Sequence, residues 1–141
     1  MTASATTFLQ TLKTHLSGIT PANGYAVTVA SVQTGRSALA GNTAGPYPAL
    51  TLTPISERPV ENTPDRFMQR WERTLILEAA LVESANWDDE LDAVWDAIRH
   101  RLTSWSGIIT EWGPVEFAPP EDGGGIALLR CPLVFTYLFT V

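Results

Sequence analysis

Two histidines, one cysteine and a group of carboxylates are the side chains of this 141-residue chain that could support catalysis or metal binding. Neither His15 nor His100 has a cysteine or second histidine at the short spacing that zinc sites use. His100 follows Asp96 by four residues, which favours an exposed pair on one helix, and His15 is expected at the edge of an apolar helix stripe. Cys131 lies in an apolar strand pattern, which favours an unreactive buried thiol.

Two further features are also better explained as structure than as chemistry. Carboxylates are spread around the outer side of an expected helix and begin at its amino-terminal end, where the helix dipole stabilises them. These residues are Asp88, Asp89, Glu90, Asp92 and Asp96. The glycines at 123–125 lead into a strand, whereas a phosphate-binding loop leads into a helix. The sequence therefore predicts no catalytic, cofactor-binding or metal-binding residues, and a protein that is not an enzyme.

The clearest element that must position these side chains is an amphipathic helix over residues 86–105. Its apolar residues project into an arc of roughly 100° at helical spacing. They are Trp87, Leu91, Val94, Trp95, Ile98, Leu102 and Trp105. Asn86 is placed to cap the start of this helix, and Gly107 is placed to end it.

A long strand over residues 68–84 precedes this helix and is apolar on both faces. Alternation places one set of side chains toward the core: Trp71, Leu75, Leu77, Ala79 and Leu81. The other face is charged at Arg70 and Glu72 but apolar at Ile76, Ala80 and Val82. A partner subunit would cover this second face. The alternative, that long loops of the same chain fold over it, stays open.

The remaining pattern predicts a helix over residues 5–17 and strands over 25–33, 49–56, 115–120 and 126–141. Pro54 indicates an edge or the end of its strand, because proline cannot donate to a ladder. In the last strand Leu129, Cys131, Leu133, Phe135, Tyr137, Phe139 and Val141 share one face, unless a bulge at Pro132 flips half of them. The segment at 35–48 is expected to be a long loop, and 57–67 a protruding hairpin.

This order of elements predicts an α+β fold in a single domain spanning residues 1–141. The sheet is expected to be mixed, mostly antiparallel and of about five strands, with two helices packed on one face. The net charge of −6 argues against a surface that grips nucleic acid sequence-specifically. No signal peptide or membrane span is recognised, and the single cysteine favours a reduced, cytoplasmic setting for folding.

The order of residues resembles the tail terminator (tail completion, minor tail protein U-like) proteins of long-tailed bacteriophages. The likeness rests on a short helix ending in Gly18, then Gly24-Tyr25 and a strand, then Pro48-Ala49-Leu50-Thr51-Leu52 after a variable loop. An apolar strand, the acidic helix WDDELDAVWDAIRHRL and a carboxyl-terminal strand with alternating aromatic residues follow. The likeness covers nearly the whole chain but contains no diagnostic motif.

The resemblance implies a structural virion protein that needs no cofactor. Such a protein forms a hexameric ring of identical subunits that caps the tail tube, ends its growth and presents the surface to which the head docks. Its partners would be itself, the tail tube protein and the head–tail connector proteins. DNA would pass through the ring, and no membrane would be involved. The protein would work in the tail of the virion, after assembly in the host cytoplasm.

By the same resemblance, the contacts with tube and neighbouring subunits are placed in residues 35–47 and 57–70. The candidate contact residues are Glu57, Arg58, Glu61, Asp65, Arg66, Arg70 and Glu72. Their mixed charge suits complementary contacts between proteins. Two alternatives stay open: a neck or head–tail connector subunit, and a small α+β ligand-binding module or hydrolase with polar groups around His15, Trp112 or Cys131.

Overall fold

The computed structural model describes residues 5–34, 46–60, 68–105, 108–120 and 125–140. In chain order the described elements are α1 (Ala5–Leu16), the 3-10 turn η1 (Pro21–Asn23), β1 (Ser31–Thr34), β2 (Ala49–Pro59), β3 (Met68–Val82), α2 (Trp87–Thr103), β4 (Ile108–Trp112), β5 (Glu116–Ala118) and β6 (Ile126–Thr140). They form an α+β fold, as predicted from the alternation of strand and helix patterns.

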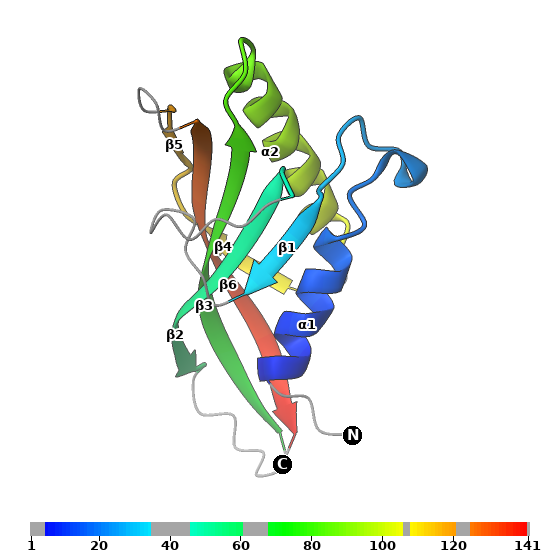
Figure 1. The fold of residues 1–141 in the computed structure, drawn as a ribbon. Coiled ribbons are helices and arrows are strands. Elements are labelled where there is room, and N and C mark those ends of the chain that lie inside the picture. Colours follow the sequence, from blue (N-terminus) through cyan, green and yellow to red (C-terminus); the bar gives the residue numbers. More distant parts are fainter. Residues whose placement is uncertain (1–4, 35–45, 61–67, 106–107, 121–124, 141) are drawn as a thin grey trace.

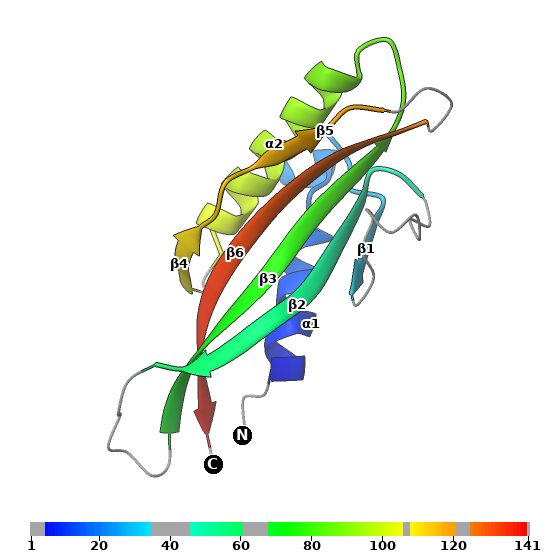
Figure 2. The same cartoon turned by 90° about the vertical axis from the view of Figure 1, so that its left-hand side faces the viewer.

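One six-stranded sheet runs through the molecule in the order β1-β2-β3-β6-β4, and β5 also pairs with β6 (Figure 1). β1 lies parallel to β2, and every other pair is antiparallel. The long strands β3 and β6 form the centre of the sheet, with β2 beside β3 (Figure 2). The prediction of a mixed, mostly antiparallel sheet is confirmed, with six strands where about five were expected.

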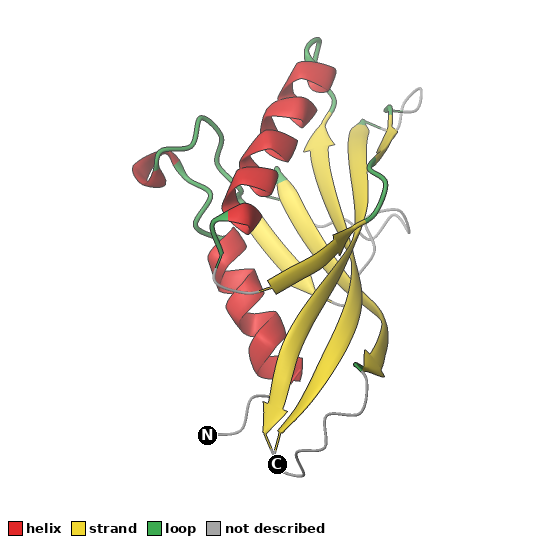
Figure 3. Cartoon of the chain, turned by 180° about the vertical axis from the view of Figure 1, so that it is seen from behind, coloured by secondary structure: helices red, strands yellow, loops and turns green. Residues whose placement is uncertain are grey.

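Both helices lie on one face of the sheet, as predicted (Figure 3). The core between them is made of residues with no exposed surface, including Leu12 and Leu16 of α1, Leu91 and Ile98 of α2, Leu75 and Leu77 of β3, and Leu129, Leu133 and Phe135 of β6. The Phe135 ring lies 5.4 Å from that of Phe8 and 5.6 Å from that of Trp105, in edge-on arrangements. The aromatic residues at the ends of both helices therefore pack on the same point of β6.

The carboxyl-terminal parts of the two helices are joined by a reciprocal pair of hydrogen bonds. Arg101 Nε donates to the carbonyl of His15 at 2.9 Å, and His15 Nε2 donates to the carbonyl of Arg101 at 2.8 Å. These carbonyls lie near helix ends, where backbone acceptors lack intrahelical donors. Gly18 leaves room for this contact, because a Cβ there would lie 2.1 Å from the Arg101 guanidinium.

The first predicted strand was wrong over residues 25–30, because only Ser31–Thr34 form a strand. The preceding residues bond elsewhere: Val29 N donates to the Ile19 carbonyl at 2.9 Å, and Ala30 N donates to the Pro48 carbonyl at 2.9 Å. Gly24 enters this segment with a φ of 90°, a left-handed conformation that glycine adopts without steric cost. The alternation at 25–29 thus reflects packing against the helices and not a ladder.

The predicted end of the second strand was also misplaced. β2 continues through Pro54 to Pro59, with a register shift between Pro54 and Ser56, and it pairs with β3 as the predicted hairpin. Beyond Leu52, the side of β2 that faces away from β3 has no described neighbour, so β2 is locally an edge strand, as Pro54 indicated.

The predicted end of the second helix was also misplaced. α2 ends at Thr103, where Ser104 N donates to the His100 carbonyl, so Gly107 does not end it. Asn86 stands at the cap position but makes no side-chain capping bond.

Sequence analysis missed β4, because no strand was predicted over residues 108–112. β4 and β5 both pair with β6, on either side of Pro132. Gly113 lies between them and donates its N–H to the Pro132 carbonyl at 2.8 Å, and a Cβ at Gly113 would lie 2.8 Å from the proline ring. The register between β3 and β6 is unbroken at Pro132, so no bulge flips the strand there.

Candidate subunit interface

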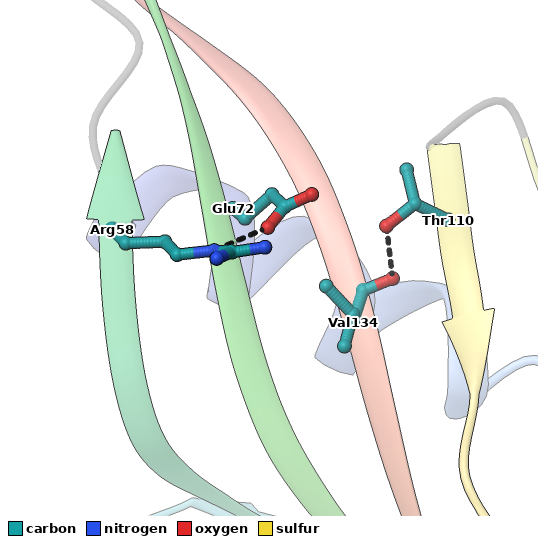
Figure 4. A network of polar contacts seen from close by, with 4 residues as sticks. All are labelled: Arg58, Glu72, Thr110 and Val134. Atoms are coloured by element: carbon teal, nitrogen blue, oxygen red, sulfur yellow. Dashed lines mark hydrogen bonds and ion pairs between the residues drawn. The ribbon is translucent and has the colours of Figure 1, made fainter. Parts of the chain in front are cut away.

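The charged hairpin of β2 and β3 extends beyond the helices at one end of the sheet (Figure 2). Arg58 and Glu72 are register partners on these two strands, and Arg58 Nε lies 2.7 Å from Glu72 Oε2 (Figure 4). Beside them, Thr110 Oγ1 of β4 donates to the Val134 carbonyl of β6 at 3.3 Å. The structure thus brings two of the predicted contact residues into one ion pair.

Glu57 lies on the opposite face from Arg58, because consecutive residues of a strand alternate. Tyr137 of β6 donates its hydroxyl hydrogen to Glu57 Oε1, and its ring stacks on Phe8 at 5.4 Å. Burial and the Glu57 carboxylate together raise the pKa of Tyr137 to about 12, although Arg73 opposes this. Tyr137 was not among the predicted contact residues, and nothing in the sequence pairs it with Glu57, 80 residues away.

The other predicted contact residues are divided between described and undescribed parts of the chain. Arg70 is exposed near the start of β3, and its carbonyl accepts the N–H of Val60 at 2.9 Å. Glu61, Asp65 and Arg66 lie outside the described residues, as does most of the predicted contact segment at 35–47. The described hairpin end therefore presents Glu57, Arg58, Arg70 and Glu72 from two adjacent strands.

We use the name outer face for the side of the sheet away from the helices. There the prediction of an exposed apolar surface on β3 needs correction. Ile76 is only 7% exposed and Ala80 is fully buried within the single chain, whereas Val82 at the strand end is 52% exposed. A partner subunit is therefore not needed to remove Ile76 and Ala80 from water, which fits the alternative that the chain covers this part itself.

A polar row crosses the outer face beside these apolar residues. Thr51, Glu78, Arg130 and Glu116 are successive register partners on β2, β3, β6 and β5. Thr51 and Glu78 are buried, and Arg130 lies directly across from Glu78. Arg130 is half-buried and Glu116 is exposed, so this row runs from the interior of the sheet to solvent.

The candidate catalytic residues are engaged in structural contacts. His100 is exposed on α2, as predicted, and its Nδ1 lies 3.0 Å from the Tyr25 hydroxyl, whereas Asp96 forms an ion pair with Arg99. His15 bonds the Arg101 carbonyl. Burial raises the pKa of the Cys131 thiol to about 11, so the thiol is protonated at neutral pH. No group of three or more potential metal ligands occurs among the described residues.

Four large apolar side chains are exposed in the described structure: Ile55, Val82, Trp112 and Phe117. Trp112 lies at the edge of the sheet in β4, and its ring meets that of Trp95 edge-on at 6.0 Å. Ile55 lies in the irregularity of β2, at the opposite edge. The hydrophobic surface that a partner could cover is therefore concentrated at the edges and ends of the sheet.

No helix in the described part of the chain is long and apolar enough to cross a membrane. Comparison with protein-family models gave no match, and comparison with curated protein sequences gave none either.

Proposed function

We propose that this chain is a structural subunit of a bacteriophage tail, a terminator that assembles as a hexameric ring on the end of the tail tube. In this role it ends tube growth and provides the surface to which head–tail connector proteins dock. It acts by binding proteins and carries out no reaction. The proposal keeps the resemblance in element order, which the α+β fold with both helices on one face supports.

The observation that carries the proposal is the charged end of the sheet. There β2 and β3 pair as a hairpin whose described end carries Glu57, Arg58, Arg70 and Glu72. Mixed charges at the rim of a contact favour correct docking and disfavour wrong partners. The histidines and the cysteine are already engaged in packing and hydrogen bonds, which supports a protein whose work is assembly.

The decisive experiment is light scattering coupled to size exclusion, with negative-stain imaging, of the full chain alone and with tail tube protein. We expect rings, or complexes of defined stoichiometry on tube ends. Monomers at every concentration, with and without tube protein, would contradict the proposal. Binding to connector proteins but not to the tube would favour the neck subunit instead.

A thermal-shift screen with metabolites and metal ions addresses the remaining class. A ligand that binds only the folded chain raises its melting temperature by mass action. We expect no stabilisation. A clear shift that is lost on substitution of His15 or Trp112 would favour a ligand-binding module or hydrolase.

A further inference from the structure

The two long edges of the sheet face away from each other at the same height along the strands. On one side, residues 54–59 of β2 have no described strand beside them once β1 has ended. On the other side, β4 pairs only with β6 in the described chain. We call these the β2 edge and the β4 edge.

Register places the two edges level with each other. Trp112 of β4 pairs with Leu133, which pairs with Leu75, which pairs with Pro54 of β2. At the other end of β4, Ile108 is connected in the same way through Thr136 and Glu72 to Arg58. The sheet is thus four strands wide here, and both of its edges span the same rows.

The two edges also run in opposite directions, because three antiparallel pairings separate them. A second copy placed beside the first, with its β2 edge against the β4 edge, would meet it as an antiparallel pair in matching rows. Edge strands offer unpaired backbone groups of this kind. Each edge carries one register shift, between Pro54 and Ser56 and between Ile109 and Glu111, in neighbouring rows.

The side chains on the two edges are complementary. Ile55 on the β2 edge is 57% exposed and Trp112 on the β4 edge is 39% exposed, within one row of each other. Glu111 is exposed and would stand diagonally across from the partner's Arg58, within reach of long side chains. Arg58 has donors to spare beyond its bond to Glu72.

We infer that copies of this chain join head to tail, with the β4 edge of one copy pairing with the β2 edge of the next and continuing the sheet between subunits. Such a contact uses two different surfaces, so it propagates and closes into a ring when the rotation between copies allows. The inference rests on the proposed function in that it names the surfaces through which the ring forms.

A cysteine pair tests this contact directly. Ser56→Cys and Glu111→Cys replace two exposed residues of the same row, one on each edge. Within one chain they are separated by three strand spacings, about 14 Å, whereas a disulfide needs Cα atoms within about 7 Å. Any disulfide between them must join two copies, and Cys131 is buried and stays out of the reaction.

The chain with both substitutions is oxidised at high concentration and analysed by non-reducing electrophoresis. We expect a ladder of linked copies that ends at one closed species. A mixture of the two single variants should give linked dimers and nothing larger, because each copy then has only one reactive edge. Val82→Cys combined with Glu111→Cys is the matched control, since Val82 is exposed but lies on neither edge.

The outcomes separate this inference from the proposed function. Rings seen by light scattering and imaging without the 56–111 link would overturn the edge pairing and leave the ring standing. A ladder without a closed species would support the edge pairing and contradict the ring. If the 56–111 cysteine variant gives no more linked copies than the 82–111 control, and the chain stays monomeric, both the edge pairing and the proposed ring are overturned.

Discussion

The two faces of the sheet bury side chains in different ways, although they belong to the same strands. On the helix side, Leu75, Leu77 and Ala79 of β3 are fully buried among apolar neighbours from both helices. On the outer face the same strand runs from the Arg58–Glu72 ion pair through buried Ile76 and Glu78 to exposed Val82. The helix side of β3 is an apolar core from Leu75 onward, whereas the outer face changes from charged to buried to exposed along its length.

The largest expected effect compares a core residue with an exposed one on β3. Leu77→Ala should lower the free energy of unfolding by about 2–5 kcal/mol, because it leaves a cavity beneath the helices. Val82→Ala, its control on the outer face, should cost no more than about 0.5 kcal/mol. Urea unfolding measures both. Equal costs would contradict the contrast between the two faces.

Ile76→Ala sharpens the comparison by testing whether the chain itself buries the middle of the outer face. Because Ile76 is 7% exposed in the single chain, we expect a loss of about 2 kcal/mol or more. The loss should be the same at all protein concentrations. A loss that appears only at concentrations where the protein associates would show that a neighbouring copy covers this residue.

High pH should lower the stability of the folded chain through two groups on the helix side of the sheet. Tyr137 and Cys131 have pKa values raised to about 12 and about 11 in the folded chain, so each stays protonated where its unfolded counterpart ionises. The unfolded chain then binds fewer protons, and stability falls with rising pH. The fall should begin near pH 9 for Cys131 and near pH 10 for Tyr137.

Melting temperatures measured from pH 9 upward follow this loss of stability. Cys131→Ala and Tyr137→Phe should each make it shallower, in their own parts of the range. An unchanged pH profile in Tyr137→Phe would mean that burial and the contact with Glu57 do not raise the pKa of this phenol in the folded chain.

The smallest expected effect concerns the exposed ion pair on the outer face. A double-mutant cycle of Arg58→Ala and Glu72→Ala should give a coupling energy of about 0.2–1 kcal/mol, as exposed pairs usually do. Salt at about 1 M should reduce it, because screening then acts within a few ångströms. A coupling above this range, insensitive to salt, would place the pair in a buried contact.

Several features of the fold could be predicted because their signals are local. The helix stripe through Leu91, Val94 and Ile98 and the alternation through Leu75, Leu77 and Ala79 follow from the spacing of apolar side chains alone. β4 was missed although its sequence, IITEW, mixes β-branched and aromatic residues, because its five residues are too few for a clear period. Glycine at 107 and proline at 114 also pointed toward a turn.

The candidate interface was predicted only in outline. The charge of the hairpin can be read directly from the sequence, but the pairing of Arg58 with Glu72 depends on the register of β2 against β3. A register shift of one residue would put them on opposite faces. The contact of Glu57 with Tyr137 depends further on the order of strands in the sheet, which separates these residues by only one strand.

Amino-acid order alone therefore specified which segments are helices and long strands and which side of each is apolar, because both depend on neighbours a few residues apart. The folded chain settled which strands adjoin, that β1 runs parallel to β2, that Ile76 is covered, and that two edges without a further described strand stand level with each other. These features depend on contacts between residues far apart in sequence, where the packing of the whole chain, and not local spacing, determines the lowest free energy.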